Sequence, residues 1–454
     1  MSSAALPGFR DFYPDELARR AHIFQAWRAV TRRYAFVEYD GPPLEPLELY
    51  TKKSGDEIVG QLYNFTDKGG REVALRPEMT PTFARMVGAR ANALRKPVRW
   101  FSIPQLFRYE RAQRGRLREH FQLNVDIVGE SSEVADAELL AVAVDIMREL
   151  GLTSADVRAR VSDRRLLNAI LGAFGVSEAQ RPAVYAVLDK AGRQPHEVSA
   201  GKLAAAGLDP AAVDQVLALL APGAGAAALA AAPAGEDADR MRRYLAHAEA
   251  LGIADWIDVD FSIVRGLAYY TGFVFELFDA RGELRAICGG GRYDTLLKSL
   301  GGADLPALGF GMGDVVLGEL LTDRGLFPTT AGATADLYVV AGDGAVGVPY
   351  ADTLRLIAAL RQAGFSVDHG LNAERFLSQA TRNQVDGARK AGAAAVIARR
   401  ADGRWEVTSI LGRLKDAPTH LLDAPAILAG DAPILDGLRA WLMAQRATAP
   451  ETHG

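Results

Sequence analysis

Residues 118–126 read REHFQLNVD, and polar and apolar side chains alternate along them. A period of two predicts a β-strand, because successive side chains of a strand point to opposite faces of its sheet. One face is apolar, and the other carries Arg118, His120, Gln122, Asn124 and Asp126. A row of guanidinium, imidazole, amide and carboxylate groups differs from the interchangeable polar residues of a solvated strand face. We therefore predict that this strand is the floor of a site for a charged ligand.

The preceding residues, 107–118, read FRYERAQRGRLR and contain five arginines against one glutamate. They are typical of the other strand of a hairpin followed by a basic loop. This concentration of positive charge favours an anionic ligand beside the strand. The alternative is a surface hairpin whose charge has no function.

The totals describe an ordinary globular protein of 454 residues, 49% hydrophobic and 24% charged, for which we expect two or three domains. The net charge of −4 provides no general basic field, so nucleic-acid binding must depend on local patches such as residues 108–118. A single cysteine, Cys288, excludes a disulfide framework and favours the reducing cytoplasm. We expect no signal peptide in residues 1–6, and no uninterrupted apolar stretch of membrane-spanning length occurs.

The hydrophobic pattern predicts an α+β domain in residues 1–325, with an antiparallel sheet flanked by helices. A first helix begins at Pro14 and buries a stripe of Leu17, Phe24, Trp27, Val30 and Tyr34. Short strands follow, then an amphipathic helix over 135–150. Helical patterns replace strands over about 165–255, which indicates an inserted helical segment, and the Ala- and Gly-rich stretch 221–235 is typical of a flexible surface segment. Strands are predicted again at 258–261, 268–277, 286–291 and 307–313.

Residues 326–334 are predicted to be a linker to a small α/β domain, 335–454. Here strands at 336–341, 365–368 and 394–398 alternate with helices at 350–363 and 376–391, which favours a partly parallel sheet. A closing helix is expected at 435–446.

Four further segments carry polar residues or glycines in patterns that suit a binding site. Residues 75–80, LRPEMT, place Glu78 and Thr80 after a strand, although both could simply cap a helix. Residues 264–276, VRGLAYYTGFVFE, place an arginine beside glycine, while the tyrosines could be core residues. Residues 288–294, CGGGRYD, place three consecutive glycines before an arginine, although the glycines could be needed only for a tight turn. Residues 308–314, LGFGMGD, leave one strand face bare, against which a flat ring could lie.

Other catalytic and metal-binding patterns are missing from the sequence. No Walker loop, zinc-ligand set or Ser-His-Asp arrangement occurs, and the seven histidines and one cysteine are widely scattered. We therefore expect no protein-bound transition metal.

Taken together, these motifs resemble the class II aminoacyl-tRNA synthetases, and among them the histidine–tRNA ligases. The resemblance rests on residues 6–11 (LPGFRD), on Glu78 and Thr80, on the arginine hairpin, on 265–272 (RGLAYYTG) and on 289–294 (GGGRYD). It covers about residues 5–320 and, more loosely, the C-terminal domain. The string in 265–272 is the most specific of these motifs.

The resemblance implies that ATP and L-histidine form histidyl-adenylate and that histidine tRNA then takes the histidyl group. Catalysis is expected to depend on positioning of the substrates and on neutralisation of their charge by arginines and ATP-bound Mg²⁺. It also implies a cytoplasmic homodimer, whose interface would include the N-terminal helix, and an anticodon-binding C-terminal domain. The implied catalytic residues are Arg108 and Arg265; the histidine-binding residues are Glu78, Met79, Thr80, Arg108, Gln122, Asp126, Arg265, Tyr269 and Tyr270; the ATP-binding residues are Arg108, Glu110, Arg116, Arg118, His120, Phe121, Gly311 and Gly313.

The chain departs from the family pattern at three places. Val315-Val316 stands where the family usually has Glu-Arg, so another cation such as Arg292 or Arg118 would have to contact ATP. The order His120-Phe121 leaves open which ring stacks on adenine. The C-terminal domain lacks much of the family's usual sequence pattern around residues 379–392.

Two other functions remain open from the sequence. One is the non-catalytic, synthetase-like regulatory subunit of ATP phosphoribosyltransferase, which usually lacks the C-terminal domain and the intact 265–272 string. The other is a tRNA-binding sensor without aminoacylation. The presence of the C-terminal domain and of the intact 265–272 string favours the enzyme, whereas Val316 favours the regulatory subunit.

Overall fold

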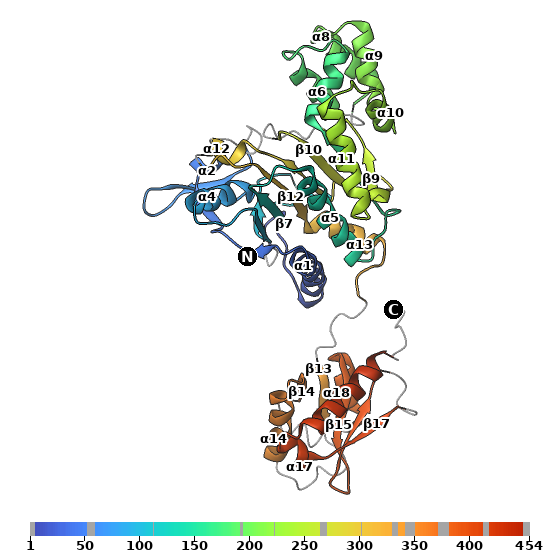
Figure 1. The fold of residues 1–454 in the computed structure, drawn as a ribbon. Coiled ribbons are helices and arrows are strands. Elements are labelled where there is room, and N and C mark those ends of the chain that lie inside the picture. Colours follow the sequence, from blue (N-terminus) through green and yellow to red (C-terminus); the bar gives the residue numbers. More distant parts are fainter. Residues whose placement is uncertain are drawn as a thin grey trace. The chain divides into compact units, whose positions relative to one another are not determined.

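The chain consists of two compact units, residues 1–327 and 328–454, which we describe separately (Figure 1). In this computed structural model the described residues are 5–51, 60–111, 113–190, 194–221, 223–263, 270–300, 302–328, 335–340, 350–370, 381–411 and 417–447.

A nine-stranded sheet forms the centre of the first unit, in the order β1-β5-β7-β12-β11-β10-β8-β9, with β6 pairing to β7. The strands are β1 (Val37–Glu38), β5 (Val98–Ser102), β6 (Gln105–Phe107), β7 (Glu119–Val128), β8 (Val157–Asp163), β9 (Ile257–Val259), β10 (Phe273–Asp279), β11 (Cys288–Arg292) and β12 (Ala307–Gly313). All pairs are antiparallel except β1–β5 and β8–β9. The expectation of an antiparallel sheet is therefore corrected to a mixed one. The parallel pair β8–β9 is possible because the helical segment between these strands acts as the crossover that a parallel pair requires.

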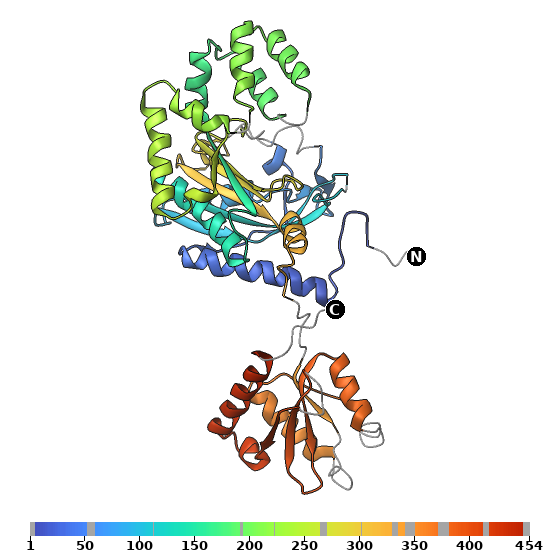
Figure 2. The same cartoon turned by 90° about the vertical axis from the view of Figure 1, so that its right-hand side faces the viewer.

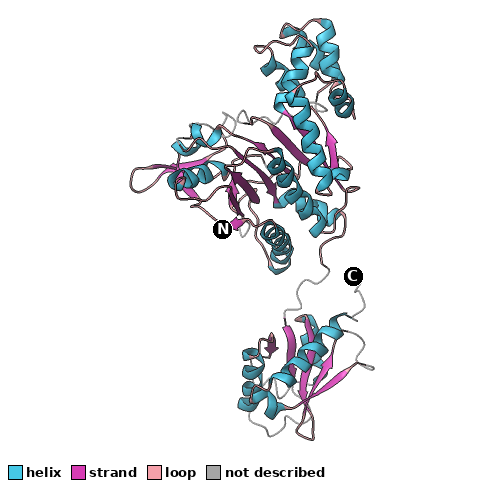
Figure 3. Cartoon of the chain, in the orientation of Figure 1, coloured by secondary structure: helices cyan, strands magenta, loops and turns pink. Residues whose placement is uncertain are grey.

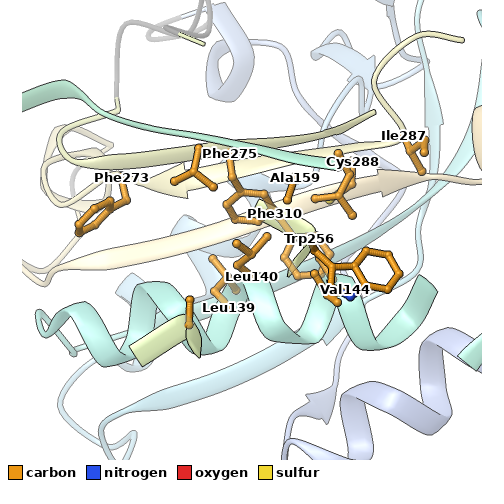
Figure 4. Packing of buried hydrophobic residues seen from close by; sticks show 14 of the residues in the cluster. Leu139, Leu140, Val144, Ala159, Trp256, Phe273, Phe275, Ile287, Cys288 and Phe310 are labelled. Atoms are coloured by element: carbon orange, nitrogen blue, oxygen red, sulfur yellow. The ribbon is translucent and has the colours of Figure 1, made fainter. Parts of the chain in front are cut away.

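Helices α1 (Pro14–Arg33), α5 (Glu133–Glu149) and α13 (Asp314–Asp323) pack against the apolar side of this sheet. Leu140 and Val144 of α5 lie under the strands that carry Phe275 and Phe310 (Figure 4). In Figure 2, α1 is the dark blue helix along one face of the sheet, and its Trp27 Nε1 donates to Met312 Sδ at 3.3 Å. The prediction that α1 buries a stripe beginning at Leu17 is wrong at that residue, because Leu17 is 42% exposed.

The inserted segment is helical, as predicted; most of its helices gather at one end of the unit, and its last helix runs back beside α5 (Figure 3). The helices are α6 (Arg164–Ala173), α7 (Arg181–Leu188), α8 (His196–Ala205), α9 (Pro210–Ala218), α10 (Ala224–Ala230) and α11 (Glu236–Ala250), followed by the 3₁₀ turn η1 (Ala254–Trp256). The expectation of a flexible surface stretch at 221–235 is wrong, because α10 packs against β9. A Cβ on Gly225 would lie 1.8 Å from the Val259 carbonyl oxygen, so only glycine permits this approach.

Beside the polar face of the sheet lies a smaller sheet, β2-β4-β3, formed by Leu44–Pro46, Glu72–Leu75 and Tyr63–Thr66. Three helices complete this part of the unit: α2 (Glu48–Thr51), α4 (Thr80–Arg90) and α12 (Leu296–Ser299).

The second unit contains a five-stranded sheet in the order β14-β13-β15-β16-β17. Its strands are β13 (Ala335–Val340), β14 (Val367–His369), β15 (Ala393–Arg399), β16 (Trp405–Ser409) and β17 (Thr419–Leu422), and its helices are α14 (Tyr350–Gln362), α16 (Thr381–Lys390), α17 (Ala424–Leu428) and α18 (Ala432–Ala447). The first three strands are parallel, as the alternating pattern indicated, while β16 and β17 are antiparallel additions that the sequence analysis missed. Among the described residues, no helix is both long and apolar enough to cross a membrane.

Candidate active site

The polar face of β7 is built by its pairing with β12, which sets glycines opposite the polar side chains. Gly309 pairs with Asp126, and Gly313 pairs with Gln122. A Cβ on Gly309 would lie 2.1 Å from Asp126 Oδ1, and one on Gly311 would lie 2.8 Å from Gln122 Cδ. The expectation of a bare strand face is therefore wrong at these two glycines, because β7 side chains cover them. At Gly313 a Cβ would meet no described atom within 4 Å.

Asp126 is a buried carboxylate, 5% exposed, whose Oδ1 accepts a hydrogen bond from the Tyr293 hydroxyl. Burial raises the pKa of Asp126 to about 7, while the Tyr293 hydrogen bond opposes that rise. The ring of Tyr270 belongs to the same apolar cluster as Tyr293. The hydroxyl of Tyr39 is buried without a hydrogen-bond partner among the described residues. Asp126 can therefore accept a proton or a hydrogen bond near neutral pH.

Arg108 lies close to His120, which is near the start of β7, the strand that also carries Asp126. Arg108 Nε donates to the Pro77 carbonyl oxygen at 2.9 Å, which fixes the guanidinium beside Glu78. Burial, together with the positive charges of Arg108 and Arg10, lowers the pKa of His120 to about 3. His120 is consequently a neutral aromatic ring at neutral pH.

The ring of Phe121 lies on the opposite face of β7 from His120, because neighbouring strand residues alternate. It contacts Phe12 and Phe24, with ring centroids 6.3 and 5.3 Å away, and the Arg20 guanidinium lies 4.5 Å from its centroid. The expectation that Phe121 binds ATP is therefore wrong. Its ring is committed to packing against α1 and the segment before it.

The segment 75–80 leads directly into α4, which begins at Thr80. Met79 is 1% exposed, and at the N-cap position its side chain makes no capping hydrogen bond. Whether Glu78 and Thr80 bind substrate or only cap this helix stays a prediction. Glu78 is half-buried and lies next to the Arg108 contact at Pro77.

The basic loop is held by its own acid and by α13. Arg116 forms an ion pair with the buried Glu110 carboxylate, whose Oε1 has no hydrogen-bond partner among the described residues. Arg118 Nε donates to the Glu110 carbonyl oxygen at 3.1 Å. Arg114 pairs with Glu319 of α13 at 3.2 Å. Two loop arginines therefore already have carboxylate partners.

Arg292 does not provide the replacement cation that the sequence analysis considered. It is 1% exposed, and its guanidinium bonds to Asp136 at 2.7 Å and to Asp294 at 3.1 Å. This arginine joins β11 to α5 and is a structural residue. Val316 is also buried, in the core beneath the sheet.

The helix-covered side of the sheet contains a pocket of about 430 Å³ between α13 and the start of α1. Arg10 lines it and pairs with Glu119 at 2.7 Å and with Asp314 at 3.0 Å. The pocket is on the Phe121 side of β7, so we place the candidate active site at the polar face, where the ionisable groups converge.

The structure places four of the predicted residues on one side of the hairpin. Arg108, His120, Gln122 and Asp126 share the polar side of the hairpin, and Gly311 lies under Gln122. Arg265 and Tyr269 lie outside the described residues. Tyr293 was missed as a site residue, although the sequence analysis noted its motif; only its bond to Asp126 reveals its importance. Among the described residues, no group of three or more His, Cys, Asp or Glu side chains could hold a metal ion.

Comparisons with known proteins agree on one family. Residues 8–313 match the family model described as histidyl-tRNA synthetase. The histidine–tRNA ligase of Opitutus terrae is 50% identical over 81% of this chain and 85% of its own length. The histidine–tRNA ligase of Halobacterium salinarum is 43% identical over 82% and 86%. The crystal structure of histidyl-tRNA synthetase from a Nostoc species has a similar fold, with a TM-score of 0.78 at 21% identity over 97% of this chain and all of that one.

Proposed function

The chain belongs to the histidyl-tRNA synthetase family and charges tRNA with histidine, and from this premise we propose which of its residues do so. Class II synthetases use ATP with Mg²⁺, and we propose the same two substrate components here. The histidine carboxylate would attack the α-phosphorus of ATP and release pyrophosphate. The terminal ribose hydroxyl of the tRNA would then attack the adenylate carbonyl and release AMP.

Asp126 is the group that would recognise the imidazole of histidine. An ionised carboxylate accepts an imidazole N–H, and a site built in this way rejects analogues that lack this donor. Gly309 leaves the space that the carboxylate occupies, and Tyr293 fixes its orientation. Gln122, Glu78 and Thr80 would hold the α-amino group, with Met79, Tyr269 and Tyr270 around the substrate.

Arg108 would neutralise charge at the α-phosphate and the substrate carboxylate, together with Arg265. The contact of Arg108 with Pro77 supports this role, because the hydrogen bond to the Pro77 carbonyl oxygen restricts the guanidinium in the free protein. A preorganised cation at a phosphate undergoing transfer is typically responsible for a factor of about 10² to 10³ in rate.

The adenine would stack on His120 rather than on Phe121. Only His120 points to the polar face, and its low pKa keeps the ring neutral at neutral pH. We expect His120→Phe to keep the KM for ATP within about threefold, whereas His120→Ala should raise it roughly tenfold, because one base-stacking contact is lost. Equal effects of the two substitutions on the KM for ATP would contradict the stacking role.

The remaining ATP contacts are proposed for the basic loop and its base. Glu110 has an acceptor oxygen available for the adenine amino group. Arg116 and Arg118 would approach the phosphates, and the backbone at Gly311 and Gly313 would border the nucleotide. For Arg116 this requires exchange of its Glu110 partner for phosphate.

The observation that carries the proposal is that a buried carboxylate, Asp126, and a neutral ring, His120, share one face of β7, with Arg108 close to that ring. Its test is histidine-dependent exchange of labelled pyrophosphate into ATP, followed by tRNA charging. Arg108→Ala should reduce exchange by about 10² to 10³, whereas the exposed neighbour Arg111, changed to Ala, should leave it within about twofold. Undiminished exchange in Arg108→Ala would refute the role of Arg108.

We also propose a cytoplasmic homodimer, with residues 1–325 as the catalytic domain, 326–334 as a linker and 335–454 as the anticodon-binding domain. The family and the separate sheet of the second unit support this division. Light scattering of the purified protein at micromolar concentration should give twice the mass of the chain. A monomer that still charges tRNA would refute the dimer.

A regulatory subunit of ATP phosphoribosyltransferase is not favoured, because relatives up to 50% identical over most of the chain are named as ligases. A tRNA-binding sensor would give neither exchange nor charging in the assay above.

A further inference from the structure

The tip of the basic loop, at Gly115, lies close to Arg285, which comes from another part of the chain. Gly115 has a φ of +72° and donates its N–H to Glu319 Oε1 at 3.0 Å. A Cβ at this position would lie 3.3 Å from Val316 Cγ2 and 3.7 Å from Arg285 Cδ. Arg285, from the connection between β10 and β11, is therefore next to both the loop tip and the start of α13.

The two arginines on either side of Gly115 already have carboxylate partners. Arg114 pairs with Glu319 and Asp323, and Arg116 pairs with Glu110. Arg285 is exposed, and its guanidinium makes no hydrogen bond or ion pair with any residue that the structure describes. A guanidinium without such a partner keeps all its N–H donors available for an anionic ligand.

We propose that Arg285 binds the terminal phosphates of ATP and supplies the positive charge that Val316 does not. This inference rests on the proposed function and assigns a further ATP-binding residue to the same site. Val316 is apolar and buried, so the start of α13 provides no side-chain cation there. A guanidinium reaching in from the neighbouring connection can form paired hydrogen bonds with phosphate oxygens. The backbone N–H groups at the start of α13 add partial positive charge.

The test compares the binding of ATP and AMP to the full-length protein by isothermal titration calorimetry. Arg285→Ala should weaken ATP binding by about 10- to 100-fold, the range expected for one charge-assisted phosphate contact. AMP, which lacks the terminal phosphates, should bind the variant within about twofold of the wild type. The matched control is Arg281→Ala, an exposed arginine in the same connection that should leave both affinities unchanged.

Unchanged ATP affinity in Arg285→Ala, or equal weakening of ATP and AMP, would overturn the proposal. An equal loss in Arg281→Ala would also overturn it, because a general charge effect would then explain the result. The wild-type exchange assay tests the enzyme separately. A further outcome is that the wild type fails to exchange pyrophosphate while Arg285→Ala still selectively weakens the binding of ATP. That result would refute the proposed enzymatic role and support the contact between Arg285 and the phosphates.

Discussion

Changing Tyr293 to Phe should move the pH dependence of histidine activation towards alkaline pH. In the wild type the Tyr293 hydroxyl donates to Asp126 and lowers its pKa, which burial holds at about 7. Removing the donor raises this pKa further, so less carboxylate is ionised at any pH near neutrality. A hydrogen bond to a charged group contributes about 1.5–3 kcal/mol, which corresponds to a change in pKa of about one to two. At pH 7 the ionised fraction of Asp126 should consequently fall about 5- to 50-fold.

The assay is kcat/KM for histidine in pyrophosphate exchange, measured from pH 6 to pH 9.5. The acid limb of the profile should have its midpoint near pH 7 in the wild type and near pH 8 to 9 in Tyr293→Phe. Protonation of free histidine is the same for both proteins and cancels in their ratio. Tyr34→Phe is the matched control, because its hydroxyl donates to Asp145 at 2.7 Å away from the site. An unchanged midpoint in Tyr293→Phe, or a shift to lower pH, would refute the reasoning.

Four other substitutions test the site and its support. Gly309→Ala should reduce kcat/KM for histidine at least tenfold, since its Cβ would fall 2.1 Å from Asp126 Oδ1; wild-type kinetics would show that the carboxylate does not need this space. Asp126→Asn should raise the free energy of unfolding at pH 8 by up to about 4 kcal/mol, measured by urea unfolding. The pKa of Asp126 is higher in the folded than in the unfolded state, so the carboxyl favours folding less and less as the pH rises from about 4 through 7. No gain at pH 8, or a gain that is as large at pH 4, would contradict that sign. Arg292→Met should cost about 3–5 kcal/mol of unfolding free energy by leaving buried carboxylates unpaired, and a loss below 1 kcal/mol would contradict its structural role. Arg265→Ala should slow exchange by orders of magnitude with little change in histidine affinity, and intact exchange would remove Arg265 from the proposed mechanism.

Several features of this fold were predictable from local sequence patterns. The alternation around Gln122 predicted β7, and the glycines of 307–313 predicted β12 with its bounds. The helical insertion was recognisable because strand periodicity stops and then resumes. These signals are local, since a side chain's direction within a strand or helix depends only on its position along the element.

Other features depended on which elements pack together. The order His120-Phe121 leaves open which ring faces the site, and α1 decides it by packing against Phe121 on the far side of the sheet. The sequence leaves Arg292 open as an ATP-binding cation, but Asp136 of α5 takes that guanidinium. The composition predicts flexibility at 221–235, where the closeness of β9 requires Gly225 in a helix.

By itself, the sequence determined β7, β12 and the helical insertion, the polar strand face and the resemblance to a family. Only the tertiary structure decided the partners: Tyr293 on Asp126, Glu110 on Arg116, and Arg285 beside Gly115. Two of these pairs join residues from different elements, the third closes the basic loop on itself, and the energies of all three depend on distance and burial. A linear pattern specifies neither quantity, so the ionisation of Asp126 and the availability of Arg285 appear only when the strands are assembled.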